Sequence, residues 1–436
     1  MKVFILIILI ALPNIVLAEN FTSYFSGNTN DAIVSPSGGV CLMGGATEDD
    51  SAMRWFLKRA NGGDILVLRA SGADGYNNYF YSELGVQVNS VETIVFHNRQ
   101  ASYDEYILRK IDQAEAIWFA GGDQWKYVSY WRGTPLDSAI NRAIAIRNIA
   151  IGGTSAGMAI LGNFYFTAQN GTVTSQIALA NPFNNLVTID STAFIKNKFL
   201  INTITDSHFD NPNRKGRLVA FMARIFSDYG VFAKAIACDE YTAVCIDTNG
   251  IARVFGNYPK YDDNAYFIQS NCELLERSPE NCTVATPLTW YRQAMALKAY
   301  QIKGDSLGSN YFDLNNWQNA SGGKCYDWSV QQGVFAEKEG LPINCSPNST
   351  EFLSNKIDFE LFPNPTNENL IIKYVNNQFE NLNVFLFDQL GQITRFNFEK
   401  SNSSIVLSLN GISNGIYYLV IMNGNYVVYK QKILKF

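Results

Sequence analysis

Histidine is scarce in this chain, which has only two, His97 and His208, among 436 residues. The sequence also lacks a Cys-x-x-Cys pair, and groups of histidine and cysteine are the usual ligands of zinc. We therefore expect no metal centre and no cofactor. The same scarcity leaves two choices for a catalytic base.

Positive charge is also limited. The chain has 34 Lys and Arg against 39 Asp and Glu, its net charge is −5, and its basic residues do not gather along the sequence. Nucleic acids and other polyanions need a basic surface. The composition therefore argues against nucleic acid as a partner.

A long hydrophobic run occurs at the N-terminus, in MKVFILIILIALPNIVLAEN. Lys2, the apolar run over 3–12 and the small residue Ala18 predict a signal peptide over residues 1–18. A retained membrane anchor is the weaker interpretation, because a membrane-spanning helix needs about 20 apolar residues. The signal peptide predicts export, and no later segment is long and apolar enough to span a membrane, so we expect the mature protein to be soluble once exported.

Seven cysteines in an exported chain indicate disulfides. We expect Cys272 to pair with Cys282, and Cys325 with Cys345, because each pair would close a short loop in polar sequence. The other cysteines lie in apolar runs, where a buried free thiol is common; they are Cys41, Cys238 and Cys245. The last two flank a predicted turn and could pair instead.

Short apolar runs alternate with helical stretches over residues 37–250. The runs VCLMGG, DILVLRAS, ETIVFH, AIWFAGG and NIAIGGTS are typical of strands buried on both faces, and most end in Gly or Ser. Strands that alternate with helices predict an α/β fold with a doubly wound, mostly parallel sheet. Ligands of such sheets bind beyond the carboxyl ends of the strands.

The composition and the hydrophobic pattern change after about residue 300. We predict an α/β domain over 19–300, an irregular extension and linker over 301–350, and a separate domain over 356–436. The last range carries period-2 strands such as ENLIIKYV and GIYYLVIM, with turns between them and no helix. This pattern predicts a small antiparallel β-sandwich.

The stretch IAIGGTSAGMAIL contains a Gly-x-Ser-x-Gly pattern at a strand-to-helix junction. A tight turn of this kind lifts its serine out of the sheet, and residues larger than glycine on either side would collide with the backbone. We therefore predict a nucleophile elbow with Ser155 as the nucleophile, flanked by Gly153 and Gly157.

A serine nucleophile needs a base. His208 lies where the apolar strand INTIT runs into polar loop residues, at a place where a parallel sheet presents side chains to a ligand. His97 ends an earlier strand, and a structural role is the better interpretation for it. We therefore assign His208 as the base.

The order of the residues along the chain indicates on which side of the histidine the acid of the triad lies. An α/β-hydrolase places it between serine and histidine and often carries an HGGG-type oxyanion loop. This chain has no HGG, and it offers only Asp190 and Asp206 in that interval, of which Asp206 is too close to His208 along the chain. Beyond the histidine, Asp239 and Glu240 lie at a turn between two apolar strands. The order Ser, His, acid is therefore favoured.

Four motifs in this order resemble the cyanophycinase and dipeptidase E group of serine peptidases, whose fold is similar to class I glutamine amidotransferases. The motifs are WFAGGDQ, GGTSAGM, DSHF followed by two arginines, and CDEYTA, and the match covers roughly residues 38–300. The resemblance implies a triad that cleaves aspartyl peptides or isopeptides. It implies Ser155 as nucleophile, His208 as base, Glu240 as acid, and Gln124, Arg214 and Arg217 in the substrate pocket.

The residues themselves support these roles. The N–H of Ala156, at the start of the helix, and an N–H of the 121–122 loop, assigned to Gly122, would stabilise an oxyanion. Arg214 and Arg217 could pair with a substrate carboxylate in bidentate fashion. The ordinary alternative for both arginines is a solvated position on a helix.

Two departures from the motif bear on the substrate. Cyanophycinases have a motif similar to DQHF where this chain has DSHF, with Ser207 in place of the glutamine. They have one similar to GGNQ where this chain has GGDQ, with Asp123 in place of the asparagine. The missing glutamine removes an amide that could bind substrate. Cleavage of the β-linked aspartyl-arginine of cyanophycin is thus less firmly implied than peptide hydrolysis.

The C-terminal range carries a second resemblance. LFPNPTNENLIIKY, LGQITR, GISNGIYYLVI and KQKILKF resemble the C-terminal sorting domain of the type IX secretion system. The alternative for such a sandwich is a carbohydrate-binding or adhesive module. The resemblance implies export to the outside or the cell surface, with the outer-membrane secretion machinery as a partner.

Together these patterns predict a secreted serine peptidase of cyanophycinase type that works through an acyl-enzyme. Its partner would be a peptide substrate, with cyanophycin and aspartyl dipeptides as candidates, and a homodimer is compatible with the sequence. Two alternatives stay open: an esterase or other acyl hydrolase with the same triad, and a non-catalytic binding protein of the same fold.

Overall fold

The computed structural model describes residues 19–192, 194–345, 360–373, 382–389, 394–401, 404–423 and 426–436. The chain divides into two compact units, Met1–Cys345 and Ser346–Phe436. The predicted signal peptide and the last part of the predicted linker, 346–350, lie outside the described residues.

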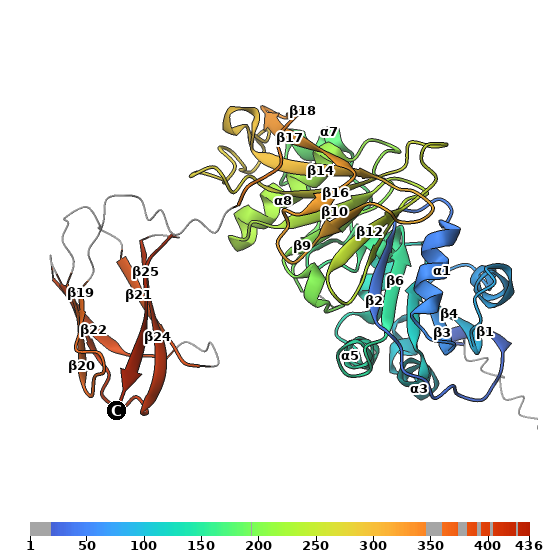
Figure 1. Cartoon of the computed structure of the whole chain (residues 1–436), viewed down its shortest axis with the longest axis horizontal. Coiled ribbons are helices and arrows are strands. Elements are labelled where there is room, and N and C mark those ends of the chain that lie inside the picture. The colour runs from blue at the N-terminus through green and yellow to red at the C-terminus, as the bar shows by residue number, and fades with distance from the viewer. Residues whose placement is uncertain are drawn as a thin grey trace, which may run out of the picture. The chain divides into compact units, whose positions relative to one another are not determined.

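A ten-stranded sheet crosses the first unit in the order β1-β4-β3-β5-β6-β2-β11-β12-β15-β16 (Figure 1). Its strands are β1 (Phe21–Gly27), β2 (Gly39–Met43), β3 (Asp64–Arg69), β4 (Ser90–Phe96), β5 (Ala116–Phe119), β6 (Ala150–Thr154), β11 (Ala243–Ile246), β12 (Ile251–Phe255), β15 (Tyr311–Asp313) and β16 (Ala320–Ser321). The five strands from β4 to β2 pair in parallel, and the strands beyond them pair antiparallel. The predicted α/β fold is confirmed, with a more mixed sheet than expected.

Helices cover both faces of this sheet because its central strands are apolar on both sides. Leu66 and Leu68 of β3 share one core with helices α3, α4 and α5, whereas Ile65 and Val67 share the opposite core with α1. The α-helices of the whole unit are α1 (Asp50–Lys58), α2 (Gly75–Asn78), α3 (Glu105–Gln113), α4 (Gln124–Trp131), α5 (Pro135–Arg142), α6 (Ala156–Ala159), α7 (Ser175–Ala180) and α8 (Lys215–Tyr229), of which the last two pack against a second sheet.

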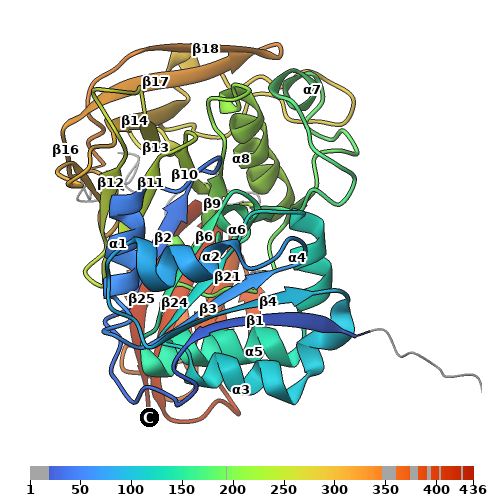
Figure 2. The same ribbon diagram turned by 90° about the vertical axis from the view of Figure 1, so that its right-hand side faces the viewer.

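A second sheet has the order β18-β17-β14-β13-β10-β9, and only β9 and β10 pair in parallel. Its strands are β9 (Thr203–Asp206), β10 (Lys234–Cys238), β13 (Asn264–Ser270), β14 (Leu297–Lys303), β17 (Gly323–Gln331) and β18 (Val334–Glu339). Helices α7 and α8 lie at the same end of the unit (Figure 2). Two short strands, β7 (Tyr165–Phe166) and β8 (Ile189–Asp190), pair separately.

The chain changes sheets between β10 and β11, so the hairpin considered for Cys238 and Cys245 does not form. Both thiols and that of Cys41 are buried and free, as the apolar surroundings predicted. The expected irregular extension over 301–350 is also wrong for its middle part. There β15, β16, β17 and β18 add edge strands to both sheets, because short polar-looking segments pair with strands that are distant in sequence.

The disulfide joins Cys272 to Cys345, and Cys282 and Cys325 are free. Both expected pairings are therefore wrong. Cys325 lies within β17, where pairing with β14 sets it opposite Tyr300. The chain then returns to the region after β13, where the Asn344 N–H donates to Glu273, and this brings Cys345 next to Cys272.

The second unit contains two antiparallel sheets, β19-β20-β23-β22 and β21-β24-β25. The strands are β19 (Glu360–Phe362), β20 (Asn369–Lys373), β21 (Leu382–Phe387), β22 (Asn397–Lys400), β23 (Ser404–Ser408), β24 (Gly415–Asn423) and β25 (Tyr426–Lys435). Alternate side chains of both sheets share one apolar core, including Leu370, Leu386, Ile405, Leu419 and Ile433. The predicted β-sandwich is confirmed.

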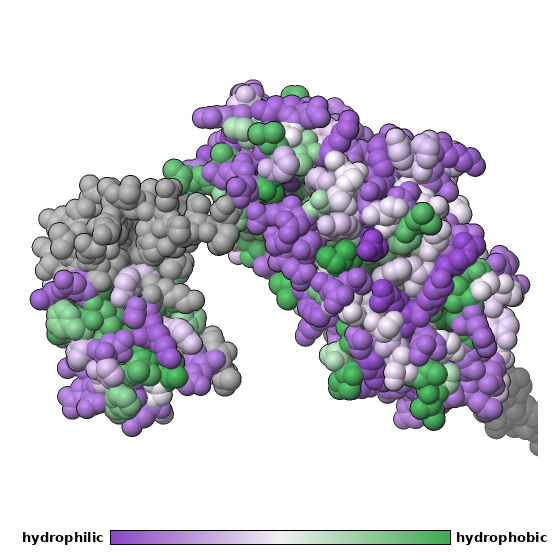
Figure 3. All heavy atoms as spheres, in the orientation of Figure 1, coloured by the Kyte–Doolittle hydropathy of each residue, from purple (hydrophilic) through white to green (hydrophobic). Residues whose placement is uncertain are grey.

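The outside of the first unit is mainly hydrophilic on the face seen in Figure 3, with hydrophobic residues in scattered spots. Among the described residues, no helix has the length and apolar character needed to cross a membrane.

Candidate active site

Ser155 lies between β6 and α6, at the carboxyl end of the parallel part of the main sheet. Its φ of 53° and ψ of −114° are strained for a residue with a side chain. A Cβ on Gly153 would lie 2.6 Å from the carbonyl carbon of Gly157, and a Cβ on Gly157 would lie 2.0 Å from the carbonyl oxygen of Phe119. The close backbone approach expected for the elbow is therefore present.

His208 follows β9 of the second sheet and turns toward this serine. Its Nε2 lies 2.8 Å from Oγ of Ser155. Its φ of 46° falls in the left-handed region, and its N–H donates to the carbonyl oxygen of Gly44 at 2.8 Å. The two sheets thus bring together two residues that are 53 positions apart.

Glu240 lies on the other side of the imidazole, with Oε1 2.6 Å from Nδ1 of His208. The side-chain amide of Asn211 donates to its Oε2 at 3.3 Å, and its own N–H donates to Asp210. The hydrogen bond from His208 lowers the pKa of Glu240, against the effect of burial, and the Asn211 contact acts in the same direction. Glu240 is therefore held as a carboxylate that accepts from Nδ1.

The turn Gly44–Gly45 after β2 connects all three segments. Main-chain carbonyls of Met43, Gly44 and Gly45 accept hydrogen bonds from Ser155, His208 and Tyr241 in turn, at 3.1, 2.8 and 3.1 Å. A Cβ on Gly45 would lie 2.4 Å from His208 Nε2. The sequence VCLMGG predicts only a strand that ends in glycines. The imidazole that Gly45 accommodates lies over 150 residues further along the chain, and Gly44 is instead close to the backbone of Asp239.

Gly45→Ala is expected to lower turnover by a factor on the order of 10², because the added methyl group must push the imidazole away from Ser155. The φ of +114° at Gly45 adds strain to the substitution. Steady-state kinetics with circular dichroism as a fold check would measure it. Gly62→Ala is the matched control, since Gly62 also has a positive φ but a Cβ there would meet nothing within 4 Å. Equal losses in both variants would contradict the steric argument.

The Gly121–Gly122 loop lies on the opposite side of Ser155. A Cβ on Gly121 would be 3.6 Å from the Cβ of Ser155, and Gly122 has a φ of +154°. The hydroxyl of Tyr127 donates to the carbonyl oxygens of Ala120 and Gly121, which fixes this loop. Gly122 and Ala156 both line the cleft in front of the serine, where the sequence placed the two oxyanion donors.

An open cleft of about 520 Å³ adjoins Ser155 and His208. Its remaining walls come from α4, the 167–174 loop and the start of α8, and its lining residues include Asp123, Gln124, Trp125, Phe166, Ala168, Gln169, Gly171, Thr172, Ser207, Arg214 and Arg217. The side-chain amide of Gln124 donates to the carbonyl oxygen of Phe166. Gln124 therefore lines the cleft as expected, while it also joins two of its walls.

The two arginines of the cleft differ. Nη1 of Arg214 donates to the Ser207 carbonyl at 2.8 Å, but its Nε is buried and has no hydrogen-bond partner among the described residues. Burial, together with the charge of Arg217, lowers the pKa of Arg214 to about 10, so it stays cationic at neutral pH. Arg217 is 4% exposed, and Asp206 holds its guanidinium through two hydrogen bonds.

The other residues weighed for the triad lie elsewhere. His97 is exposed, and its Nε2 lies 2.8 Å from the hydroxyl of Thr22. Asp190 pairs with Arg132. Asp239 is buried, and its Oδ2 accepts from Asn264 at 2.8 Å, so Glu240 and not its neighbour reaches the imidazole.

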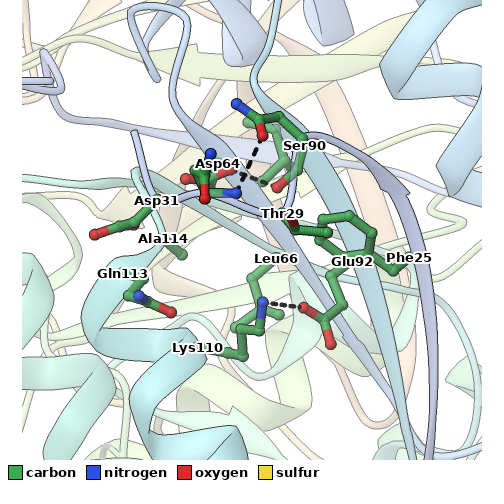
Figure 4. A pocket seen from close by; sticks show the side chains of 13 residues that line it. Phe25, Thr29, Asp31, Asp64, Leu66, Ser90, Glu92, Lys110, Gln113 and Ala114 are labelled. Carbon is green, nitrogen blue, oxygen red and sulfur yellow. Dashed lines mark hydrogen bonds and ion pairs between the residues drawn. The ribbon is translucent and has the colours of Figure 1, made fainter. Parts of the chain in front are cut away.

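A second pocket lies at the amino end of β3, away from the serine (Figure 4). Its volume is only about 30 Å³. Glu92 lies 2.9 Å from Nζ of Lys110, and Asp64 accepts a hydrogen bond from Ser90. Tyr106 and Ser23 donate to the same Glu92 carboxylate. These contacts hold edge strand β1 against the sheet. Over the described ranges, no group of three or more His, Cys, Asp or Glu is placed to hold a metal ion.

Two regions of the chain match known families. Residues 66–251 match Peptidase family S51, and residues 360–435 match the Secretion system C-terminal sorting domain. Both resemblances predicted from the sequence are confirmed. The first match contains Ser155, His208 and Glu240, and the second coincides with the β-sandwich.

Similar relatives include two cyanophycinases. That of Geminocystis herdmanii is 26% identical over 222 residues, which are 47% of this chain and 76% of the relative. That of Trichormus variabilis is 22% identical over 271 residues, which are 60% of this chain and 83% of the relative. Among solved structures, a peptidase from an acI-B1 Actinobacterium has a TM-score of 0.38 and 14% identity, over 53% of this chain and 90% of its own.

Proposed function

We propose that this chain is an exported serine peptidase that hydrolyses aspartyl peptide or isopeptide bonds through a Ser155–His208–Glu240 triad. The observation that carries the proposal is the continuous hydrogen-bonded arrangement of the three side chains, at 2.8 and 2.6 Å, beside an open cleft. The match to Peptidase family S51 supports the same class of reaction.

In the proposed mechanism, His208 accepts the proton of Ser155 as Oγ attacks the substrate carbonyl, and it then donates that proton to the leaving amine. Glu240 keeps Nδ1 protonated, so that Nε2 is free to accept, and it stabilises the imidazolium that forms. The N–H groups of Ala156 and Gly122 would stabilise the tetrahedral oxyanion. Water, activated by His208, then hydrolyses the acyl-enzyme by the same steps in reverse.

Arg214 supports an acidic substrate group. Its guanidinium faces the cleft with one buried N–H unpartnered, and a buried cationic donor of this kind favours a carboxylate. An aspartyl residue brings such a carboxylate next to the scissile bond, whether the bond is an α- or a β-linkage. A β-aspartyl-arginine unit is one substrate of this class.

Product analysis would test the proposal. The purified chain is incubated with cyanophycin, a panel of α- and β-aspartyl dipeptides, matching asparaginyl dipeptides and a simple ester, and the products are identified by mass spectrometry. We expect release of aspartate from aspartyl substrates and little reaction with the asparaginyl controls. Ester hydrolysis without peptide hydrolysis would favour the esterase alternative. No labelling of Ser155 by a fluorophosphonate would favour the binding protein.

The sorting domain supports a second part of the proposal, which is delivery to the cell surface or the medium after a signal peptide over 1–18 is removed. We expect a truncated chain, Glu19–Thr350, to keep near-parental peptidase activity. All three triad residues lie in the first unit, and the truncation retains Cys345, which forms the disulfide with Cys272. Expressed in the native host with its signal peptide, the same truncation should accumulate in the periplasm. Normal delivery to the medium would contradict the sorting role. Loss of activity with folding intact would place part of the site in the sandwich.

A further inference from the structure

Arg217 of α8 lines the cleft and contacts both β9 and the 167–174 loop. We infer that Arg217 is a positioning residue that acts, together with Asp206, on the backbone carrying His208 and on the 167–174 loop. This differs from the expectation that Arg217 binds the substrate carboxylate. The inference rests on the proposed function, because it assigns a role within the same site.

The contact with Asp206 is bidentate. Nε of Arg217 donates to Oδ2 at 2.9 Å and Nη2 donates to Oδ1. The two side chains are each 5% exposed, and the guanidinium lies over the rings of Phe166 and Phe221, 5.6 and 5.7 Å from their centroids. A paired, planar contact in a buried site fixes the relative position of β9 and α8.

The pair reaches His208 through one residue. Oδ1 of Asp206 also accepts the N–H of Ser207 at 3.0 Å, so the carboxylate is held from one side by Arg217 and holds the next peptide group on the other. His208 follows directly with a φ of 46°, a conformation that its surroundings must impose. If Asp206 moved, Ser207 and then the imidazole would move with it.

The same guanidinium also holds the 167–174 loop. Nη1 of Arg217 donates to the Val173 carbonyl at 3.3 Å. Independently of the guanidinium, the main-chain N–H of Arg217 donates to Oγ of Ser175, the first residue of α7, at 3.1 Å. The loop supplies Ala168, Gln169, Gly171 and Thr172 to the lining of the cleft. Arg217 therefore anchors a substrate-facing loop as well as the base.

The contacts leave Arg217 poorly suited to bind an anion directly. Each of its three nitrogens already donates a hydrogen bond, and Asp206 compensates its charge at short range. Arg214, in contrast, has an unpartnered Nε and pairs with no carboxylate at salt-bridge distance within the described part of the chain. The two arginines thus have separate tasks, and only Arg214 is left for the substrate.

The test compares Arg217→Lys with the parent in the full chain. Lysine keeps the charge but cannot make the bidentate contact. We expect the rate at which a small fluorophosphonate labels Ser155 to fall on the order of 10²-fold, because that reaction needs a correctly placed His208 but no carboxylate recognition. We also expect kcat to fall by a similar factor, with KM little changed, on the best aspartyl substrate.

Arg224→Lys is the matched control. Arg224 lies on the same helix, pairs with Asp228 at 2.8 Å, donates to the Pro182 carbonyl and lies over Phe183, but it does not line the cleft. Ser155 of the Arg224→Lys variant should react with the fluorophosphonate at the parental rate. A raised KM in Arg217→Lys, with labelling at the parental rate, would overturn the inference in favour of a substrate ligand.

Folding is checked by circular dichroism. If Arg217→Lys does not fold, the double variant Asp206→Leu/Arg217→Met removes both buried charges together and avoids an unpaired one. We expect the fluorophosphonate to label Ser155 of this double variant more slowly than in the parent. Labelling at the parental rate would overturn the inference. A parent chain in which Ser155 is not labelled at all would overturn the proposed function itself, which distinguishes the two failures.

Discussion

Ser155→Ala is expected to lower kcat by a factor on the order of 10⁴ or more, because the variant has no group that can form the acyl-enzyme. Turnover of an identified aspartyl substrate by matched amounts of parent and variant would measure the loss. The alanine fits the space of the serine, so the thermal unfolding midpoint should stay close to that of the parent. Near-parental turnover by Ser155→Ala would show that another residue is the nucleophile.

His208→Ala should give a loss of similar size, and the double variant should lose little more, because triad members act as a unit. The chain supplies its own control, since His97→Ala removes the only other histidine, whose ring contacts Thr22 and does not line the cleft. We expect His97→Ala to retain turnover. Multiplicative losses in the double variant would mean that Ser155 and His208 contribute independently.

The parts of the site that sequence analysis could identify are those set by local chain geometry or by elimination. Gly153 and Gly157 are recognisable because a strand-to-helix elbow leaves no room for a Cβ, and the structure has that crowding. His208 could be named because one alternative existed. Glu240 could be preferred over Asp239 only by resemblance, since residue order does not decide between neighbours.

The parts that could not be predicted depend on contacts between distant segments. Gly45 must be glycine because His208 lies against it, and nothing near Gly45 in the sequence indicates an imidazole. Arg217 looks like an exposed arginine in the first turns of a helix until Asp206 is placed opposite it. The Cys272 to Cys345 disulfide likewise follows from how β17 pairs with β14, which loop length alone does not reveal.

Glu240→Gln is expected to lower kcat by a factor on the order of 10³ to 10⁴ while the fold is retained. The amide has nearly the same shape as the carboxylate, but its NH₂ group can donate to Nδ1 of His208. That donation leaves the proton on Nε2, where it blocks transfer from Ser155. The loss therefore comes from the wrong tautomer and not from a missing contact.

Asp239→Asn separates this effect from a general sensitivity of the CDEY turn. Asp239 is one residue away, is buried, and contacts Asn264 instead of the triad. We expect its turnover to stay close to that of the parent. If Asp239→Asn instead loses more activity than Glu240→Gln, the acid of the triad is Asp239, and the proposed hydrogen-bond chain is wrong by one residue.

The pH dependence of unfolding should give opposite signs for these two variants. Burial raises the pKa of Asp239 to about 7 from an ordinary value near 3.8, so between these values the folded chain keeps a proton that the unfolded chain has released, and stability falls as pH rises. Asp239→Asn abolishes that loss of stability. The unfolding midpoint of the variant should therefore increase relative to that of the parent as pH rises from about 4 to about 7. The hydrogen bond from His208 lowers the pKa of Glu240, so this group adds stability above its ordinary pKa that is lost on acidification. The unfolding midpoint of Glu240→Gln should therefore decrease relative to that of the parent as pH rises through the acidic range. If the midpoints of the two variants instead change with pH in the same way, the distinct environments assigned to these adjacent carboxyl groups are wrong.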